Sequence, residues 1–292
     1  MTTPTPPHTY HIDHSDEAGH APSHPTHQGA YCLLVHGFNG EPAEMRELAN
    51  VLRAEGMKPR RLLLPGHGTN IYDFAAHGWD DWFAAVRRAT TEALGRYEWV
   101  FLIGHSLGAA LSLAVASVEP EVAGVVALCP PVRLHGPTQR LVERLRGVVP
   151  AIPTWTEDVH DRQGARSLYR RNVYPWTPLS AVHSLFTALP NLRGMLPDVR
   201  CPALIVRAQR DHVVPARDGL EAYELIGSTQ KKLITLERSF HAVTKDVERE
   251  IVFAETVTFC HEVMVGAHAD HQRSHHGQQR HPHQQQASLT ES

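Results

Sequence analysis

Residues 99–118 read WVFLIGHSLGAALSLAVASV, and this stretch determines the fold expected of the chain. An apolar, β-rich run is followed directly by the composition of a buried helix. Between them stands Gly104-His105-Ser106-Leu107-Gly108, a serine at a strand-to-helix turn. Such a turn strains the serine backbone and crowds its neighbours, and glycine on either side relieves the crowding. The hydroxyl of Ser106 is then raised above a sheet edge at the positive end of a helix dipole.

This setting predicts Ser106 as a nucleophile, against the alternative of a turn that merely contains serine. His105 is expected to pack or to support the site, because its side chain points away from that of its neighbour. A helix-opening amide, that of Leu107, is available to a developing negative charge.

Similar alternation of strands and helices extends on both sides of this stretch. We expect strands at residues 31–35, 61–64, 99–103, 124–128, 203–208 and 232–236, and helices at 42–55, 79–94, 107–118 and 247–265. Strand followed by helix, repeated, predicts an α/β fold with a mostly parallel central sheet and helices on both faces. Continuous apolar strands such as CLLV, VFLI and ALIV fit a sheet buried on both sides.

The alternation breaks between about residues 131 and 197, where Pro, Arg and aromatic residues gather. We expect a small helical cap insertion there, with helical pieces near 138–148 and 179–192. Residues 1–28 and 266–292 are rich in Pro, Thr, His, Gln and Ser, and are expected to be disordered tails around a domain of residues 29–265. Whether the His-rich tails bind metal ions is left open.

Composition excludes several classes of protein. The formal net charge of −3 offers no basic excess for a nucleic-acid partner. We expect no secretory signal, because MTTPTPPHTY has no basic segment followed by an apolar one. We expect no stable membrane insertion, because the longest apolar stretch is too short to span a bilayer. The four cysteines have no metal-ligand spacing and are expected to be free buried thiols in a cytoplasmic protein. No metal or organic cofactor is required, and the oligomeric state is undetermined.

A second glycine-containing loop, Val35-His36-Gly37-Phe38-Asn39-Gly40, follows the first expected strand. Acyl transfer needs two N–H donors aimed at the oxygen that becomes negative. We expect the backbone N–H groups of Phe38 and Leu107 to form this oxyanion hole. The alternative is a tight turn without a chemical role, and His36 is expected only to brace the loop.

A nucleophilic serine needs a base and a carboxylate that orients the base. In folds that place the serine at this kind of strand-to-helix turn, the chain order is Ser, then Asp or Glu, then His. Asp211 comes just after the strand ALIVRA, where loops form the ligand crevice, and His241 comes after the last strand. Asp198 and Asp218 compete for the role of the acid, but one precedes that strand and the other lies in the next helical segment. His212 is too close to Asp211, and His261 lies within the last helix.

Taken together, VHGFNG, PGHGT, GHSLGAALSLAVA, VVPARDG and SFHAVTKD resemble the small bacterial carboxylesterases of the α/β-hydrolase superfamily, with monoacylglycerol-lipase-like enzymes as close relatives. The resemblance covers about residues 30–265 and implies a serine hydrolase with Ser106, Asp211 and His241 as catalytic triad. It places the oxyanion amides at Phe38 and Leu107. The segment 131–197 has no clear counterpart, so acyl specificity is not implied.

We therefore expect a carboxylesterase acting on short- to medium-chain esters, with a small-molecule ester as its partner in the reaction. A monoacylglycerol lipase, a thioesterase, an acyltransferase or a carbon–carbon bond hydrolase would use the same site. A ligand-binding protein with a hydrolase fold is the alternative outside enzymes, and turnover of a simple aryl ester separates it from the rest.

Overall fold

A computed structural model describes residues 29–133, 142, 144–145, 148–154, 158–160 and 174–278 of the 292-residue chain. Its centre is a six-stranded sheet in the order β2-β1-β3-β4-β7-β8, and every neighbouring pair is parallel. The strands are β1 (Ala30–Val35), β2 (Lys58–Leu62), β3 (Trp99–His105), β4 (Gly124–Leu128), β7 (Ala203–Ala208) and β8 (Lys231–Leu236). The predicted α/β architecture is confirmed.

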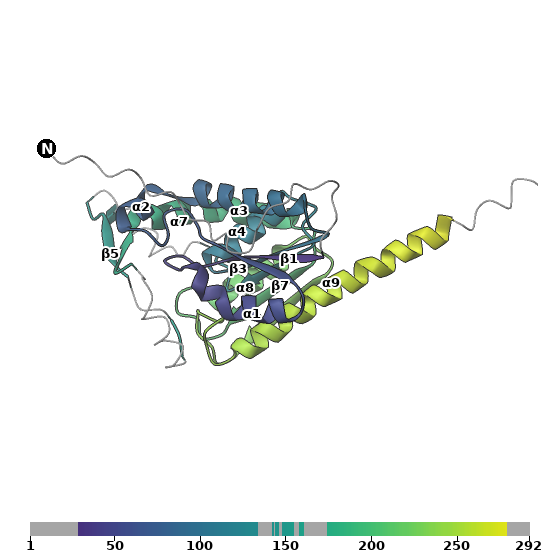
Figure 1. Ribbon diagram of the computed structural model, residues 1–292. Helices are drawn as coiled ribbons and strands as arrows, with labels where there is room; N and C mark the ends of the chain where they lie inside the picture. Colours follow the sequence, from purple (N-terminus) through teal and green to yellow (C-terminus); the bar gives the residue numbers. More distant parts are fainter. Residues whose placement is uncertain are drawn as a thin grey trace, which may run out of the picture.

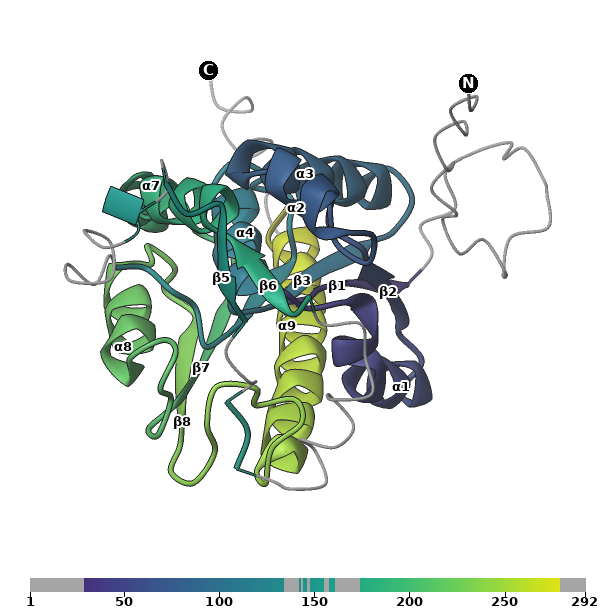
Figure 2. The same cartoon turned by 90° about the vertical axis from the view of Figure 1, so that its left-hand side faces the viewer.

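Helices cover both faces of this sheet, and Figures 1 and 2 show the two layers. One face carries α3 (Trp79–Leu94), α4 (Leu107–Ala116), α7 (Leu179–Met195) and α8 (Ala216–Leu225), and the other carries η1 (Pro42–Met45), α1 (Arg46–Ala54) and α9 (Arg249–Gln278). Successive β1 side chains enter opposite cores, with Leu33 in one and Leu34 in the other. This arrangement explains why the strand is apolar at every position.

Several elements differ from the prediction, among them β2, α2 and α9. Strand β2 lies at residues 58–62 rather than at the expected 61–64. It is an edge strand, which need not be apolar, so the charged stretch KPRRL has no apolar pattern to mark it. A short helix, α2 (Ile71–Ala76), begins where Asn70 accepts hydrogen bonds from the amides of Tyr72 and Asp73. Helix α9 continues to Gln278, so the expected boundary of the C-terminal tail at residue 266 falls inside it.

Between β4 and β7 the chain leaves the sheet. Its described parts contain an antiparallel pair, β5 (Ala151–Pro153) with β6 (Trp176–Pro178), and then α7 and η2 (Leu196–Asp198). The expected helical piece at 179–192 is confirmed as α7, whereas the one at 138–148 lies mostly outside the described residues. Asn39 donates a 2.8 Å hydrogen bond from Nδ2 to Thr177 Oγ1, so β6 reaches the loop after β1.

Trimming both ends is expected to leave the domain unchanged. A chain of residues 29–266 should keep its Tm and should keep kcat/KM within about a factor of two, because the removed segments are poor in large apolar residues. Thermal unfolding and ester hydrolysis of the trimmed and full chains check this. A Tm lower by several degrees would show that a removed segment docks on the domain.

Candidate active site

The parallel register brings the loops that hold the predicted site residues to one edge of the sheet. Val35 at the end of β1 pairs with Gly104 in β3, so the loops that follow these two strands lie side by side. Strands β7 and β8 pair from Ala203–Lys231 to Ala208–Leu236, and their following loops contain Asp211 and His241. The strand ends therefore gather groups that are distant in sequence, as expected of parallel sheets.

Ser106 has the strained backbone that the motif predicts, with φ 53° and ψ −115°. A Cβ added at Gly104 would collide with the carbonyl of Gly108, and one at Gly108 would collide with the carbonyl of Val35. Both glycines are therefore required by close backbone approach. The packing of α4 on β3 holds Ser106 in this strained conformation, and the residue is buried, with 8% of its surface exposed.

The glycine loop after β1 lies against this turn. A Cβ added at Gly37 would stand 3.5 Å from the Ser106 Cβ, and the amide of Gly40 donates to the Gly37 carbonyl at 3.0 Å. The side chain of Phe38 packs against Phe74 and Trp82. The amide of Phe38 thus belongs to a loop that borders Ser106, and the amide of Leu107 opens helix α4.

Asp211 and His241 form a close pair. His241 Nδ1 and Asp211 Oδ2 are 2.7 Å apart, and the Asp211 side chain is 1% exposed. The amides of Val213 and Val214 donate to Asp211 Oδ1 at 2.8 and 2.7 Å. Burial disfavours the charge, but the His241 ring and these amides lower the pKa of Asp211 below its ordinary value. The carboxylate is therefore ionised and aligned with the ring.

Ser106 and His241 come from neighbouring loops without direct bonding. The ring of His105, the residue before Ser106, lies 4.9 Å from the ring of His241, measured between centroids. Within the part of the chain that the structure describes, no hydrogen bond joins Ser106 to His241. Such bonds are often long in the absence of substrate and tighten when it binds.

A buried ion pair between His105 and Glu44, in which the role of Glu44 was not predicted from the sequence, connects the loops of the site. His105 Nδ1 contacts the carboxylate of Glu44, and its Nε2 contacts the His241 carbonyl oxygen at 2.9 Å. Glu44 also accepts the amide of Gly37 at 3.2 Å. Burial opposes both charges, but mutual attraction raises the pKa of His105 and lowers the pKa of Glu44. The pair connects the loop after β1, the Ser106 turn and the His241 loop.

Replacing Glu44 by Gln is expected to destabilise the fold in a pH-dependent way. The lowered pKa of Glu44 contributes stability above its ordinary value of 4.5, and this is lost as the pH falls. The raised pKa of His105 contributes stability below its ordinary value of 6.5, and this is lost as the pH rises. The free energy of unfolding of the wild type should therefore exceed that of Glu44→Gln most between pH 4.5 and pH 6.5. The difference there should be about 3 kcal/mol, the scale of a broken buried ion pair.

Denaturant unfolding of both proteins at pH 3.5, 5.5 and 8.5 checks this expectation, and Glu41→Gln is the matched control on the same loop. A stability gap of the same size at all three pH values would show that Glu44 acts through packing rather than charge.

The two competing aspartates have other places. Asp198 is exposed in η2, which precedes β7, whereas His241 lies in the loop that follows β8. Asp218 is fully buried in α8, where Oδ2 accepts the amides of Val132 and Arg133 at 3.1 Å each. The expected place of Asp218 in the helical segment after ALIVRA is confirmed. Its carboxylate fixes the first residues of the insertion.

The remaining histidines of the loops have structural contacts. His36 Nε2 accepts the amide of Leu64 at 3.2 Å, and burial lowers the pKa of this ring, which fits the expected bracing role. His212 pairs with Asp158 through Nδ1 at 2.7 Å, and its side chain is 65% exposed. His261 lies within α9.

Cys129 is a neighbour of the acid–base pair that sequence reasoning did not single out. Its Sγ and one ligand atom each of Asp211 and His241 all lie within 4.8 Å of one another. Burial and the Asp211 charge raise the pKa of Cys129 well above its ordinary value, so it stays a neutral thiol. All four cysteines are free; Cys32, Cys129 and Cys260 are buried as expected, and Cys201 is half-buried.

Two carboxylates hold the loop that carries His241. Glu248 accepts the amides of Arg238 and Ser239 at 2.9 and 2.7 Å. Asp246 accepts the amide of Phe240 at 2.7 Å through Oδ2 and that of Val247 at 2.8 Å through Oδ1. Asp246 precedes α9 and closes this loop.

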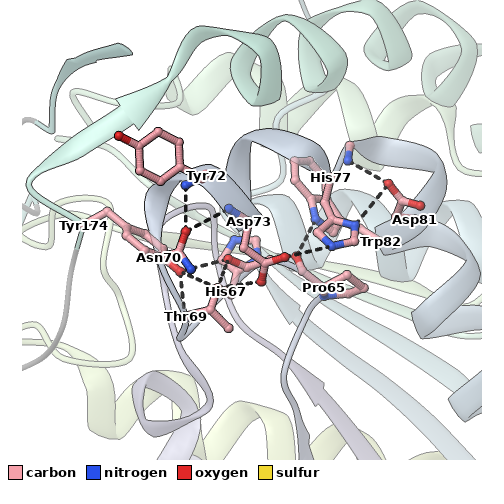
Figure 3. A network of polar contacts seen from close by, with 12 residues as sticks. Pro65, His67, Thr69, Asn70, Tyr72, Asp73, His77, Asp81, Trp82 and Tyr174 are labelled. Atoms are coloured by element: carbon pink, nitrogen blue, oxygen red, sulfur yellow. Dashed lines mark hydrogen bonds and ion pairs between the residues drawn. The ribbon is translucent and has the colours of Figure 1, made fainter. Parts of the chain in front are cut away.

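The segment PGHGTN, residues 65–70, shapes the fold beside the site, and Figure 3 shows its polar contacts. Tyr174 accepts the amide of Thr69 at 2.9 Å and donates to the Gly66 carbonyl at 2.8 Å. His67 is 1% exposed, and burial lowers its pKa to about 3, so its ring is neutral. The segment joins the insertion to the domain through Tyr174.

Comparison with known proteins finds lipolytic enzymes and esterases among those similar to this chain. A solved structure from the metagenome-derived lipolytic enzymes LipS and LipT is 32% identical, with TM-score 0.74, and the match covers 80% of this chain and 94% of that one. A thermostable monoacylglycerol lipase from Bacillus sp. H-257 is 27% identical over 78% of this chain and 88% of its own length. A carboxylesterase from Bacillus subtilis 168 is 24% identical over 78% of this chain and 90% of its own length.

The sheet, the serine turn and these relatives define an α/β-hydrolase of the serine hydrolase class, an enzyme of the esterase and lipase type. The sequence matches the serine aminopeptidase S33 family over residues 26–248, and the chain belongs to that family. In the residues the structure describes, no helix has the length and apolar character needed to cross a bilayer.

Proposed function

We propose that this protein is a carboxylesterase that hydrolyses short- to medium-chain esters through Ser106, His241 and Asp211. The observation that carries the proposal is the 2.7 Å contact of His241 Nδ1 with an ionised, buried Asp211, beside a serine in a strained strand-to-helix turn. A nucleophile, a base and an orienting acid, which follow β3, β8 and β7 at one edge of the sheet, are the parts that acyl transfer requires.

In the proposed mechanism, Ser106 Oγ attacks the ester carbonyl carbon while His241 Nε2 takes its proton. The carbonyl oxygen becomes negative and accepts hydrogen bonds from the amides of Phe38 and Leu107. His241 returns the proton to the departing alcohol, which leaves an acyl-enzyme. Water then attacks that acyl group with His241 as base, releasing the acid and restoring Ser106.

Asp211 contributes by holding the His241 ring through Nδ1, so that Nε2 faces the serine side and the imidazolium is stabilised. The neutral thiol of Cys129 is no rival nucleophile, because its raised pKa suppresses the thiolate. The residues of the site thus supply every proton transfer that ester hydrolysis needs, without a cofactor.

A monoacylglycerol is the alternative substrate class, favoured by the 27% identical monoacylglycerol lipase. We place simple esters first, because the sequence motifs resemble those of the small carboxylesterases and a carboxylesterase is also among the relatives. We also propose a cytoplasmic location, on the support of four free cysteines.

The experiment that tests the substrate class is a series of p-nitrophenyl esters with acyl chains of two to sixteen carbons, run beside monoacylglycerols of matched chain length. The proposal expects the highest kcat/KM at two to eight carbons and a lower value for the monoacylglycerols. Higher kcat/KM for a monoacylglycerol than for every simple ester would assign the alternative. An amino acid p-nitroanilide serves as the comparison for amide cleavage.

A further inference from the structure

The insertion between β4 and β7 sends one carboxylate to both loops that hold the proposed acid and base. We call residues 209–215 the Asp211 loop and residues 237–248 the His241 loop. Asp158 lies in the described segment 158–160, and its side chain is 13% exposed. Its Oδ2 accepts the amide of His212 at 2.8 Å and the amide of His241 at 3.2 Å. One oxygen atom therefore joins two loops that follow different strands.

Further bonds attach the same segment to the His241 loop. The main-chain oxygen of Asp158 accepts the amide of Ala242 at 3.0 Å, and the amide of His160 donates to Asp246 Oδ2 at 3.0 Å. Asp158 Oδ1 lies 2.7 Å from His212 Nδ1. The rings of His160 and His212 both pack on Phe240, with centroids 5.1 and 4.7 Å away. Residues 158–160 thus touch both loops at several points.

These contacts bear on the catalytic pair because of where they fall in the chain. The amide that Asp158 holds in one loop belongs to the residue directly after Asp211, and in the other loop it belongs to His241 itself. The 2.7 Å contact of the acid and base depends on the relative position of these two backbones. A displacement of about 1 Å in a catalytic group can cost about 10²-fold in rate.

We propose that Asp158 is a positioning residue, which holds the Asp211 and His241 loops in register so that the acid–base pair stays aligned. The inference rests on the proposed function of that pair. Asp158 acts through the backbone of both loops and does not touch the reacting atoms. The insertion then has a part in the chemistry, beyond any role in covering the site.

The test compares Asp158→Ala, Asp158→Asn and the control His160→Ala in the full-length protein. Asp158→Ala should lower kcat about 10²-fold with KM within about threefold, since alignment of the pair matters to the chemical step. Asp158→Asn keeps one oxygen acceptor and should lose about tenfold or less. His160→Ala loses only a ring contact of the same segment and should keep kcat within about threefold.

A double-mutant cycle separates positioning from general support of the fold. If Asp158 acts through the acid–base pair, Asp158→Ala should add less than about threefold to the loss caused by Asp211→Asn. Losses that multiply in full, or a kcat of Asp158→Ala within threefold of wild type, would overturn the proposal. Where Asp158→Ala fails to fold, the same cycle with Asp158→Asn decides by the same criterion.

Ser106→Ala keeps this test distinct from the proposed function. Activity that survives in Ser106→Ala would overturn the proposed triad. An inactive Ser106→Ala together with fully multiplying losses at Asp158 and Asp211 would overturn only the positioning role of Asp158.

Discussion

Replacing Ser106 by alanine is expected to lower kcat for an aryl ester by about 10⁶-fold, the scale seen when a triad serine is removed. The substitution deletes only the hydroxyl, so the strained turn and the glycine contacts around it stay. Substrate affinity should change little, because the amides of Phe38 and Leu107 are main-chain groups. Residual hydrolysis should come from the oxyanion hole and binding alone.

The rate of aryl ester hydrolysis by purified Ser106→Ala, measured beside that of Ser112→Ala, gives this loss of kcat. Ser112 is a fully buried serine of the same helix and is not in the site, so its variant controls for disturbance of α4. Retention of more than about 1% of wild-type kcat by Ser106→Ala would contradict a covalent role for this serine, since a triad without its nucleophile loses far more.

Replacing Asp211 by asparagine is expected to lower kcat by about 10⁴-fold. The neutral amide cannot stabilise an imidazolium. It also favours the wrong tautomer of His241, because its NH₂ group can donate a hydrogen bond to Nδ1, whereas the carboxylate only accepts one. The amides of Val213 and Val214 lose a charged acceptor but keep a neutral one, so the loop should stay folded. The loss should therefore fall on the chemical step.

The proper control for Asp211 is Asp198→Asn, because Asp198 is exposed and its replacement should leave kcat unchanged. Asp218→Asn is unsuitable, since Asp218 is buried and holds two amides of the insertion, so its loss costs about 1–3 kcal/mol of stability. All variants are compared at equal folded fraction, measured by circular dichroism. Near-native kcat in Asp211→Asn would show that another group is the acid.

The fold was predictable because the inner strands are apolar on both faces and helical segments alternate with most of them. Helix α3 was predicted at the residues where it occurs, 79–94. The exception, β2, lies at the sheet edge and carries Lys and Arg side chains, so no run of apolar residues marks it. The pairing of β5 with β6 depends on contact between segments 23 or more residues apart, which local pattern does not show.

The candidate site was predictable where chemistry demands a residue type at a strand end, as for Ser106, Asp211 and His241. Its supporting groups were not. Glu44 and Asp158 are ordinary acidic residues in sequence. Their importance arises only when folding brings Glu44 against His105, and Asp158 against the amides of two distant loops. Cys129 likewise gains its place beside Asp211 from the pairing of β4 with β7.

The central claim is that Ser106 is the nucleophile, and covalent labelling tests it most directly. The full-length protein is treated with a fluorophosphonate, digested, and mapped by mass spectrometry. The triad predicts one phosphonylated peptide, modified at Ser106, and labelling that is lost in Ser106→Ala and slowed strongly in Asp211→Asn. A phosphonate on another serine while Ser106 remains unmodified would contradict the assignment of the nucleophile.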